Sequence, residues 1–328
     1  MPGAAGPILI TGATGFIGRA LTRRLLRDGM RLVLVTRPSA ARAVAAEVGP
    51  AATVHAAALE DADALRHVVG LVRPEVVYHL AALTDPARDV RNVDVALMTN
   101  LRATIALAEA ALGVGVRVFV AAGTAEEYGR SDVPMHEDMP LRPLSPYSAA
   151  KAAASLWLKM MHDTFGLPAV VLRPFLCYGP GQAPPRLVPS AILHAIAGRD
   201  FPMTEGVQLR ELTYVDDVVD GFVRAAATPA ALGEAINLGS GVEHTVIDIV
   251  TEIYRRAGRG GRPLPGALPT RSNEMRRFAA DGSKAVRLLG WRATTPLGDG
   301  LDRTIRWAEA EGDRPVPFVL RRARGGCP

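Results

Sequence analysis

PILITGATGFIG, residues 7–18, joins a short apolar run to three glycines, Gly12, Gly15 and Gly18. An apolar run of this length that leads directly into a helical pattern predicts a buried strand followed by a helix. At such a seam, glycines permit a tight turn, close approach of a phosphate and close helix–strand packing. A pyrophosphate can then lie against free backbone amides at the positive end of the helix dipole. Ordinary strand-to-helix turns can share this spacing, so further motifs have to decide between the two readings.

The rest of the first half alternates in the same way. Its apolar runs at 7–12, 31–36, 75–81, 116–122 and 168–175 are typical of strands, and the stretches 16–29, 63–72, 96–112 and 147–166 are long enough for helices. This rhythm predicts a Rossmann-like α/β fold, a doubly wound parallel sheet covered on both faces.

From about Gly179 the pattern loosens, and the Pro- and Gly-rich stretch 179–189 predicts a loop. We therefore expect a dinucleotide-binding domain over 1–178 and a smaller C-terminal α/β substrate domain over 179–328. Within the second part, residues of about 212–243 are expected to return to the first domain. The tail, 312–328, is expected to be poorly ordered.

Composition excludes several classes of protein. The chain has 328 residues, 48% of them hydrophobic, and neither a basic, apolar leader nor an uninterrupted apolar stretch long enough to span a bilayer, so we expect a cytoplasmic protein with no membrane partner. Cys177 and Cys327 are too few for a disulfide framework and lack the spacing of a metal site, so no metal is expected. The net charge of +5 comes from scattered arginines, which favours anionic small ligands such as diphosphates over nucleic acid.

The end of the second strand, VTRPSA at 35–40, bears on the choice of dinucleotide. A site for NAD usually has a carboxylate here, about 20 residues past the glycines, to bind the adenosine 2′-hydroxyl. This chain has Arg37 and Ser39 instead, and no acid before Glu47. A guanidinium and a hydroxyl suit a 2′-phosphate, so NADP(H) is favoured over NAD(H). The alternative is that Arg37 is a solvated arginine that stacks on adenine.

A second chemical signal is SPYSAAK, residues 145–151. Ser145 can cap a helix and Pro146 suits its first position, so Tyr147 and Lys151 fall four residues apart on one helical face. An ammonium beside a phenol is expected to lower the phenol pKa and make Tyr147 a proton relay near neutral pH.

The helices expected over 95–112 and 147–165 are apolar or small on more than one face. A helix that only covers a sheet needs a single apolar stripe. The surplus faces predict a homodimer formed through these two helices; burial within one subunit is the alternative.

Taken in order, these motifs resemble those of the extended short-chain dehydrogenase/reductases, in particular the nucleotide-sugar-modifying members. The resemblance covers about residues 7–308. Its motifs are Gly12-x-x-Gly15-x-x-Gly18, HLAA at 79–82, Asn100 in MTNLRAT, GTAEEYG at 123–129, Tyr147-x-x-x-Lys151, RPFLCYGPGQ at 173–182, RELTYVDDVV at 210–219 and NLGSG at 237–241.

The resemblance implies roles for particular residues. Thr124 would be the active-site hydroxyl, Tyr147 the acid/base, and Lys151 the residue that holds the nicotinamide ribose and tunes the tyrosine. The expected cofactor-binding residues are Gly12, Gly15, Phe16, Ile17, Gly18, Arg37, Ser39, Leu59, Leu80, Ala81, Ala82, Asn100, Tyr147, Lys151 and Pro174. The expected substrate-binding residues are Thr84, Glu126, Arg186, Arg210 and Arg277, with Arg210 on the substrate diphosphate.

Several positions depart from the family pattern. Ala58 stands where an aspartate often contacts adenine, Leu176 where asparagine is common, and Glu211 where aspartate is common. In the related 4,6-dehydratases an Asp or Ser precedes the glutamate, whereas here Ala125 precedes Glu126. Alanine cannot donate a proton to a departing hydroxyl, so Glu126 is better interpreted as an acceptor for substrate hydroxyls than as half of a dehydratase acid–base pair.

These observations favour an NADP(H)-dependent ketoreductase that reduces a nucleotide-linked 4-keto-6-deoxyhexose, since ketone reduction needs only Tyr147, Lys151 and Thr124. A reductase must exchange its spent cofactor with a cellular reductant, usually NADPH, which agrees with Arg37. The alternatives are an NDP-sugar 4-epimerase that retains NAD, an NDP-hexose 4,6-dehydratase acting through Glu126, and a non-enzymatic cofactor-sensing Rossmann protein.

Overall fold

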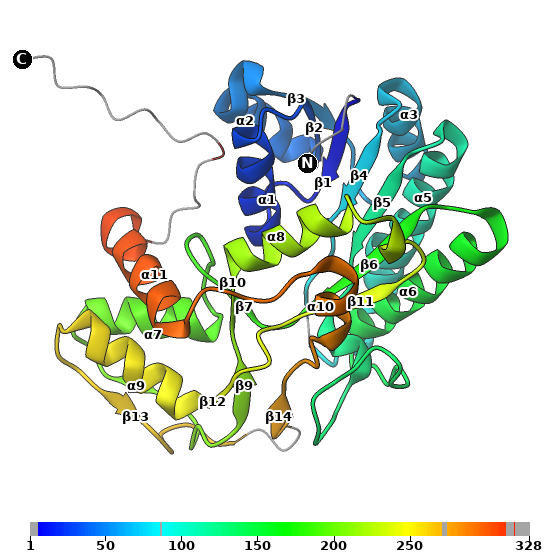
Figure 1. Ribbon diagram of the computed structural model, residues 1–328. Helices are drawn as coiled ribbons and strands as arrows, with labels where there is room; N and C mark the ends of the chain where they lie inside the picture. Colours follow the sequence, from blue (N-terminus) through cyan, green and yellow to red (C-terminus); the bar gives the residue numbers. More distant parts are fainter. Residues whose placement is uncertain (1–5, 86, 271–273, 313–317, 319–328) are drawn as a thin grey trace, which may run out of the picture.

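The computed structural model describes residues 6–85, 87–270, 274–312 and 318. Its centre is a seven-stranded sheet in which every pairing is parallel (Figure 1). From one edge to the other the strands are β11 (Ala235–Leu238), β6 (Ala169–Pro174), β5 (Val118–Ala122), β4 (Val76–His79), β1 (Ile8–Thr11), β2 (Leu32–Thr36) and β3 (Ala52–Ala56). The expected doubly wound, Rossmann-like sheet is confirmed.

The strand order reverses direction beside β1. The chain runs outward from β1 through β2 to β3 and then crosses back to β4 on the other side of β1. At such a switch point the loops that follow the two neighbouring strands run in opposite directions. The carboxyl ends of all the parallel strands lie at one edge of the sheet. That edge is therefore where the residues that follow each strand can come together.

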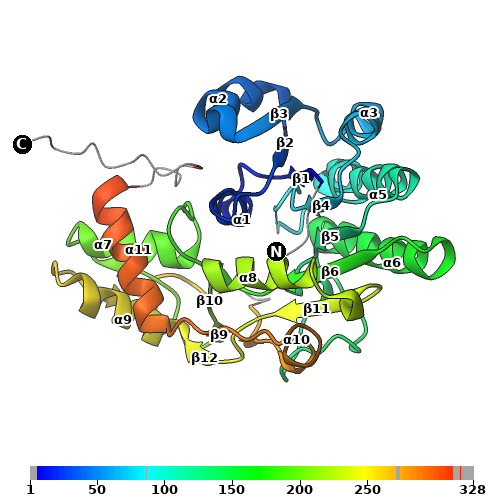
Figure 2. The ribbon, with the colours of Figure 1, turned by 45° about the horizontal axis from the view of Figure 1, so that its top comes forward.

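Helices cover both faces of the sheet because the strands at its centre are largely apolar and buried. Those of one face are α1 (Phe16–Arg27), α2 (Pro38–Val48) and α8 (Val215–Ala225), and those of the other are α3 (Ala62–Val72), α5 (Ala103–Val114) and α6 (Pro146–Phe165) (Figure 2). Two separate groups of buried side chains, one on each face, follow from this sandwich.

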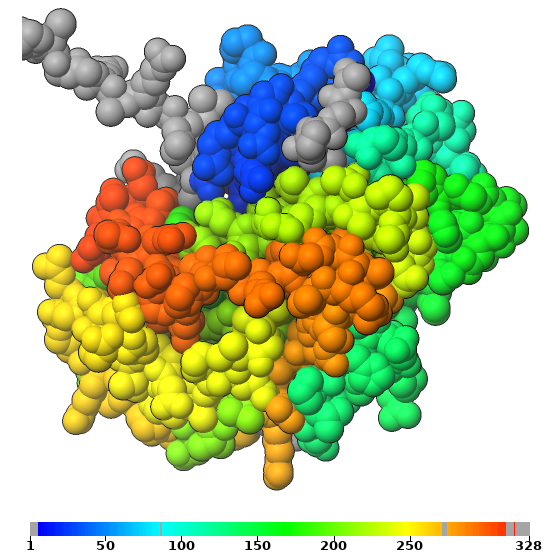
Figure 3. Space-filling view, viewed as in Figure 1, coloured from blue at the N-terminus to red at the C-terminus, as the bar shows by residue number. Residues whose placement is uncertain are grey.

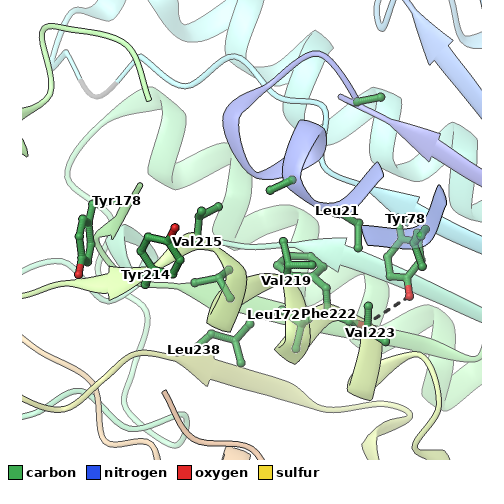
Figure 4. Close-up of a cluster of buried hydrophobic side chains, with 14 of the residues drawn as sticks. Leu21, Tyr78, Leu172, Tyr178, Tyr214, Val215, Val219, Phe222, Val223 and Leu238 are labelled. Atoms are coloured by element: carbon green, nitrogen blue, oxygen red, sulfur yellow. Dashed lines mark hydrogen bonds between the residues drawn. The ribbon is translucent and has the colours of Figure 1, made fainter. Parts of the chain in front are cut away.

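Helix α8 comes from the second half of the chain but packs on the sheet beside α1. Figure 4 shows Val219 and Phe222 of α8 among Leu21, Leu172 and Leu238, which are all fully buried or nearly so. The Tyr78 hydroxyl of β4 donates to the Phe222 carbonyl at 3.5 Å. The residues 215–238 thus return to the dinucleotide-binding half and supply both a covering helix and the edge strand β11.

The remaining helices and short strands lie beyond the sheet. They are α7 (Leu187–Ile196), α9 (Val246–Ala257), α10 (Ser283–Leu289), α11 (Leu297–Glu311), β7 (Cys177–Tyr178), β8 (Phe201–Pro202), β9 (Leu209–Glu211), β10 (Thr213–Tyr214), β12 (Glu243–Thr245), β13 (Pro263–Leu264) and β14 (Arg277–Phe278). Figure 3 shows the stretch that carries α10 and α11 crossing between the main sheet and the α9 region. The division into domains 1–178 and 179–328 stays a prediction, and this second part is more helical than its loosened pattern suggests.

The tail expected to be poorly ordered lies mostly outside the described residues, as does Cys327. Phe318 is an exception, because it is 1% exposed and packs under the Arg19 guanidinium, whose carbon lies 4.2 Å from the ring centre. Its backbone N–H donates to Glu47 at 2.9 Å. At this residue the expectation of a loose tail is wrong, since an aromatic ring and a backbone donor both find partners on the dinucleotide-binding half.

The helical segment before β5 is longer than expected. It is formed by α4 (Val93–Ala96), a π-helical turn η3 (Leu97–Arg102) and α5. Within the described part of the chain, the stretch Val90–Val114 is long and apolar enough to cross a membrane by length and composition, and half of its most apolar window is buried inside the molecule.

Candidate active site

The glycine loop lies at the carboxyl end of β1 and has no room for side chains. Gly12 has a φ of +76°, and a Cβ there would lie 2.5 Å from the Ala81 nitrogen. A Cβ on Gly18 would lie 2.0 Å from the Gly12 carbonyl oxygen. Gly15 caps α1, and no side chain of the described residues caps its amides. This cradle fits a pyrophosphate, which would accept hydrogen bonds from the first turn of α1.

Arg37 lies at the carboxyl end of β2, where it is exposed and directly precedes α2. It has no ionic partner among the described residues, and the first turn of α2, which includes exposed Ser39, has no acid. The structure thus leaves a cation and a hydroxyl at the position expected for the adenosine ribose. Leu59 and Ala58, both partly buried, follow β3 at the same edge of the sheet.

A buried histidine, the first residue of the HLAA motif and one to which the sequence analysis gave no role, connects three elements behind the glycine loop. His79 ends β4, with Nδ1 2.7 Å from the Thr11 hydroxyl and Nε2 2.9 Å from the Thr104 hydroxyl. Because Thr104 donates to the Asn100 carbonyl at 2.7 Å, it accepts from Nε2–H, and Nδ1 accepts from Thr11. Burial, together with the charge of nearby Lys151, lowers the pKa of His79 to about 3, so the ring is neutral and structural.

Asn100 lies in the π-helical turn and holds the loop that follows β4. Its Oδ1 accepts from the Leu83 N–H at 2.8 Å and its Nδ2 donates to the Leu83 carbonyl at 3.0 Å. The widened turn brings this amide to the loop, a common use of π-bulges at functional sites. Leu80, Ala81 and Ala82 are thereby fixed beside the glycines, while Thr84 beyond them is exposed. Pro174 ends β6 at the same edge.

Thr124 and Tyr147 meet directly. Thr124 follows β5 and caps the short helix η4 (Ala125–Tyr128), accepting from the Glu126 N–H at 3.3 Å. Tyr147 lies in the first turn of α6, which Ser145 caps by accepting from the Ser148 N–H at 3.1 Å. The phenol and the Thr124 hydroxyl form a hydrogen bond. Lys151, one turn further along α6, is 4% exposed.

The expected lowering of the Tyr147 pKa is wrong for this structure. The pKa is raised to about 12, mainly by burial; Glu126 and Glu127 also raise it, against the hydrogen bond with Thr124, which lowers it. Burial lowers the pKa of Lys151 to about 8, against an opposing effect of Glu127. Desolvation is therefore the largest effect on both groups, and near neutral pH the tyrosine is a phenol and the lysine an ammonium.

Glu126 faces the same space from η4. Burial raises the pKa of its carboxyl, while Arg186 and Arg88 lower it. Arg186 also acts on the Tyr147 phenol, which places this predicted substrate residue within electrostatic reach of the reacting groups. Arg88 was not among the expected residues; it lies in a loop with no periodicity, so no sequence signal marked it.

Arg210 and Arg277 both lie in the small sheet β12–β9–β14 and both already form ion pairs. Arg210 pairs with Glu274, and Arg277 pairs with Glu243. The register aligns Arg277 with Leu209, the neighbour of Arg210, so alternation places the two guanidinium groups on opposite faces of this sheet. Either of them would have to exchange its carboxylate for a phosphate in order to bind a diphosphate.

Comparison with known proteins agrees with this geometry. The family model described as "NAD dependent epimerase/dehydratase family" matches residues 8–239. The chain belongs to this family. It is part of the extended short-chain dehydrogenase/reductases, as its motifs indicated, and its relatives include nucleotide-sugar epimerases and dehydratases.

Two curated relatives illustrate the range of reactions. The UDP-glucose 4-epimerase of Mycolicibacterium smegmatis is 36% identical over 309 residues, which is 91% of this chain and 97% of that protein. The dTDP-glucose 4,6-dehydratase of Streptomyces griseus is 33% identical over 310 residues, 92% of this chain and 93% of that protein.

Solved structures show the same range. The UDP-glucose 4-epimerase of Thermotoga maritima, with UDP-glucose, has a TM-score of 0.85 and 28% identity, covering 93% of this chain and 99% of that one. A dTDP-glucose 4,6-dehydratase from Streptomyces venezuelae, with NAD bound, has a TM-score of 0.82 and 29% identity, covering 95% and 100%.

Proposed function

We propose that this protein is an NADP(H)-dependent ketoreductase that reduces a nucleotide-linked 4-keto-6-deoxyhexose. The observation that carries the proposal is Arg37, an exposed guanidinium at the carboxyl end of β2 where a site for NAD would have a carboxylate. A 2′-phosphate at this position would gain a charge-assisted hydrogen bond. A preference for the phosphorylated dinucleotide indicates net reduction with exchange of cofactor, because a catalyst that restores its own hydride needs no such supply.

The reacting groups match the needs of ketone reduction. The nicotinamide, when bound, supplies the hydride. Tyr147 holds its proton at neutral pH and donates it to the developing alkoxide, while the Thr124 hydroxyl orients the same oxygen. The Lys151 ammonium adds positive charge beside that oxygen and, by family resemblance, binds the nicotinamide ribose. Glu126, Arg186 and Arg210 are proposed to hold sugar hydroxyls and the substrate phosphates.

Elimination of water from the sugar is less well supported. A dehydratase needs an acid that protonates the departing hydroxyl in addition to Tyr147. Ala125 is buried at that position and has no proton to give. Glu126 alone could remove the C5 proton but cannot also complete the elimination.

A 4-epimerase with retained NAD is the second candidate, and a specific observation favours it. The relative with 36% identity over 91% of this chain is a UDP-glucose 4-epimerase, and solved relatives contain NAD. Such an enzyme would use the same Thr124, Tyr147 and Lys151, and Arg37 would then stack on adenine.

One experiment separates these functions. Protein purified without added cofactor is denatured and the released dinucleotide is identified; NADPH oxidation is then followed with UDP-, TDP-, GDP- and CDP-linked 4-keto-6-deoxy sugars, with NMR of the product. We expect exchangeable cofactor, stoichiometric NADPH consumption and a secondary alcohol at C4. Tightly held NAD together with interconversion of UDP-glucose and UDP-galactose would replace this proposal by the epimerase.

A further inference from the structure

Glu127 is a fully buried carboxylate between the proposed catalytic groups, and the sequence motifs assigned it no role. Its Oε1 accepts from the Thr124 N–H at 2.9 Å. Its Oε2 accepts from the Ser155 hydroxyl and from Arg173 Nε, both at 2.9 Å. Three donors from three different elements thus surround one side chain with 0% exposure.

The position of these donors connects Glu127 to the catalytic face of α6. Tyr147, Lys151 and Ser155 succeed one another at intervals of four residues, so they share one face of the helix. Glu127 accepts hydrogen bonds from Ser155, the last of these residues, and from the backbone of Thr124. The Thr124 side chain in turn forms a hydrogen bond with Tyr147, the first of them. The carboxylate therefore fixes the loop that carries Thr124 against the helix that carries the proton donor.

Its charge acts on the same groups. The titratable side chains around Lys151 are Tyr147 on α6, His79 at the end of β4 and Glu127 in η4. His79 is neutral, and among the described residues Glu127 is the charged group that opposes the lowering of the Lys151 pKa by burial. Glu127 also raises the pKa of Tyr147.

Arg173 lies on the far side of Glu127. It donates to the Tyr128 hydroxyl at 2.8 Å, and that hydroxyl donates to Asn237 Oδ1 at 2.8 Å. Glu127 and Arg173 thus form a buried ion pair, and the Arg173 guanidinium is held in place by Tyr128 and Asn237.

We propose that Glu127 is a positioning residue that keeps the Tyr147–Lys151 pair in its proton-loaded form, the form that reduces a ketone. The inference rests on the proposed reductive function, because a phenol and an ammonium are needed where a proton is delivered to an alkoxide. Glu127 touches neither substrate nor cofactor in this role; it acts through Lys151, Tyr147 and Thr124.

The test observes Lys151 directly, without substrate. The chain has three lysines, Lys151, Lys159 and Lys284. Protein with ¹³C-labelled lysine side chains gives three ε-carbon signals, which Lys159→Arg and Lys284→Arg assign by elimination. The pH titration of the Lys151 signal is then compared in the wild type, Glu127→Gln and Arg173→Gln.

We expect Glu127→Gln to lower the Lys151 pKa by about one unit or more, as is usual for removal of a nearby opposite charge. Arg173→Gln is the matched control, because it breaks the same ion pair but removes the cation; it should leave the Lys151 pKa unchanged or raise it. If Glu127→Gln fails to fold, the double variant Glu127→Gln/Arg173→Gln removes both buried charges and should still show a lowered value.

An unchanged Lys151 pKa in folded Glu127→Gln, or equal shifts in both single variants, would overturn the proposal and leave Glu127 a structural residue. In the active enzyme, the alkaline limb of kcat should move to lower pH in Glu127→Gln by the same amount as the Lys151 titration. If the titration shifts but the wild type reduces no keto sugar, the proposed function fails while the electrostatic role of Glu127 stands.

Discussion

At the scale of single residues, the chemistry depends on one hydroxyl-to-hydroxyl contact. In the proposed reaction Tyr147 delivers a proton, and the Thr124 side chain, which caps η4, interacts with its phenol. Burial keeps that phenol protonated over the physiological pH range. The site is therefore prepared to give a proton, which agrees with reduction.

Tyr147→Phe tests the proposed proton donor. The ring remains while the hydroxyl is lost, so we expect kcat to fall by about 10²- to 10⁴-fold with cofactor affinity nearly unchanged. Steady-state rates and a fluorescence titration with NADPH measure the two quantities. Full activity in this variant would remove Tyr147 from the mechanism.

Gly18→Ala tests the cradle. Because the added Cβ would lie 2.0 Å from the Gly12 carbonyl oxygen, the glycine loop has to shift, and we expect at least about tenfold weaker dinucleotide binding and a loss of about 1–3 kcal/mol in unfolding free energy. Gly70→Ala in α3 is the control, since its Cβ meets nothing within 4 Å and should raise stability by about 0.5–1 kcal/mol. Normal binding by Gly18→Ala would show that the cradle is not the phosphate site.

At the scale of elements, a buried acid joins β9 to the turn that follows β11. Glu211 is 0% exposed, and its Oε2 accepts from the Gly241 N–H at 2.6 Å. Among the described residues, its Oε1 has no hydrogen-bond partner. Burial raises the pKa of this carboxyl to about 7. The small sheet that carries Arg210 is thus attached to the main sheet through a group that titrates near neutral pH.

This attachment predicts a particular pH dependence of stability. The folded protein holds the Glu211 proton up to about pH 7, whereas the unfolded chain loses it near its ordinary value of 4.5, so stability falls as pH rises between these values. Because glutamine does not ionise, Glu211→Gln should not lose stability in this pH range. We expect it to raise Tm above pH 7 by about 5 °C, with a smaller gain at pH 5.

Thermal unfolding at pH 5 and pH 8 measures the effect. Glu60→Gln, an exchange at an exposed position after β3, serves as the control and should leave the pH dependence of the wild type intact. A gain for Glu211→Gln that is larger at pH 5 than at pH 8 would contradict a carboxyl whose pKa is raised by folding.

At the scale of the whole molecule, the expected dimer face remains a proposal with a defined surface. Apolar side chains stay exposed on α4, η3 and α6, which pack beside one another. They are Val93, Val95, Leu97, Met98, Leu156 and Trp157. Figure 2 shows α6 with its outer side unoccupied by other elements of the chain. An exposed apolar area of this kind is typical of a subunit interface.

Trp157→Glu should convert a homodimer into monomers, because it places a charge in the centre of this face. Light scattering after gel filtration measures the mass. Leu71→Glu on α3, where the leucine is 64% exposed, is the matched control and should leave the mass unchanged. A wild-type protein that is already monomeric would overturn the dimer proposal.

Local patterns in the sequence were sufficient for much of this architecture. Spacing along the chain reveals the apolar runs of β1, β2, β4, β5 and β6, because each run depends on neighbouring residues. The same is true of the glycine, Tyr-x-x-x-Lys and capping motifs. β3 was not among the strands expected because its partly exposed alternation, ATVHA, lacks a continuous apolar run. β11 is short and becomes a strand only by pairing with β6.

What tertiary structure alone decided is where charge is buried and what surrounds it. Glu127 draws its donors from residues 124, 155 and 173. Arg277 of β14 pairs with a carboxylate of β12, on the far side of β9, and Phe318 packs on α1. The sequence by itself determined the family and located the glycine cradle and the residues proposed to transfer the proton. Their pKa values were not accessible from it, because desolvation depends on which distant segments exclude water from a side chain, and spacing along the chain carries no record of that.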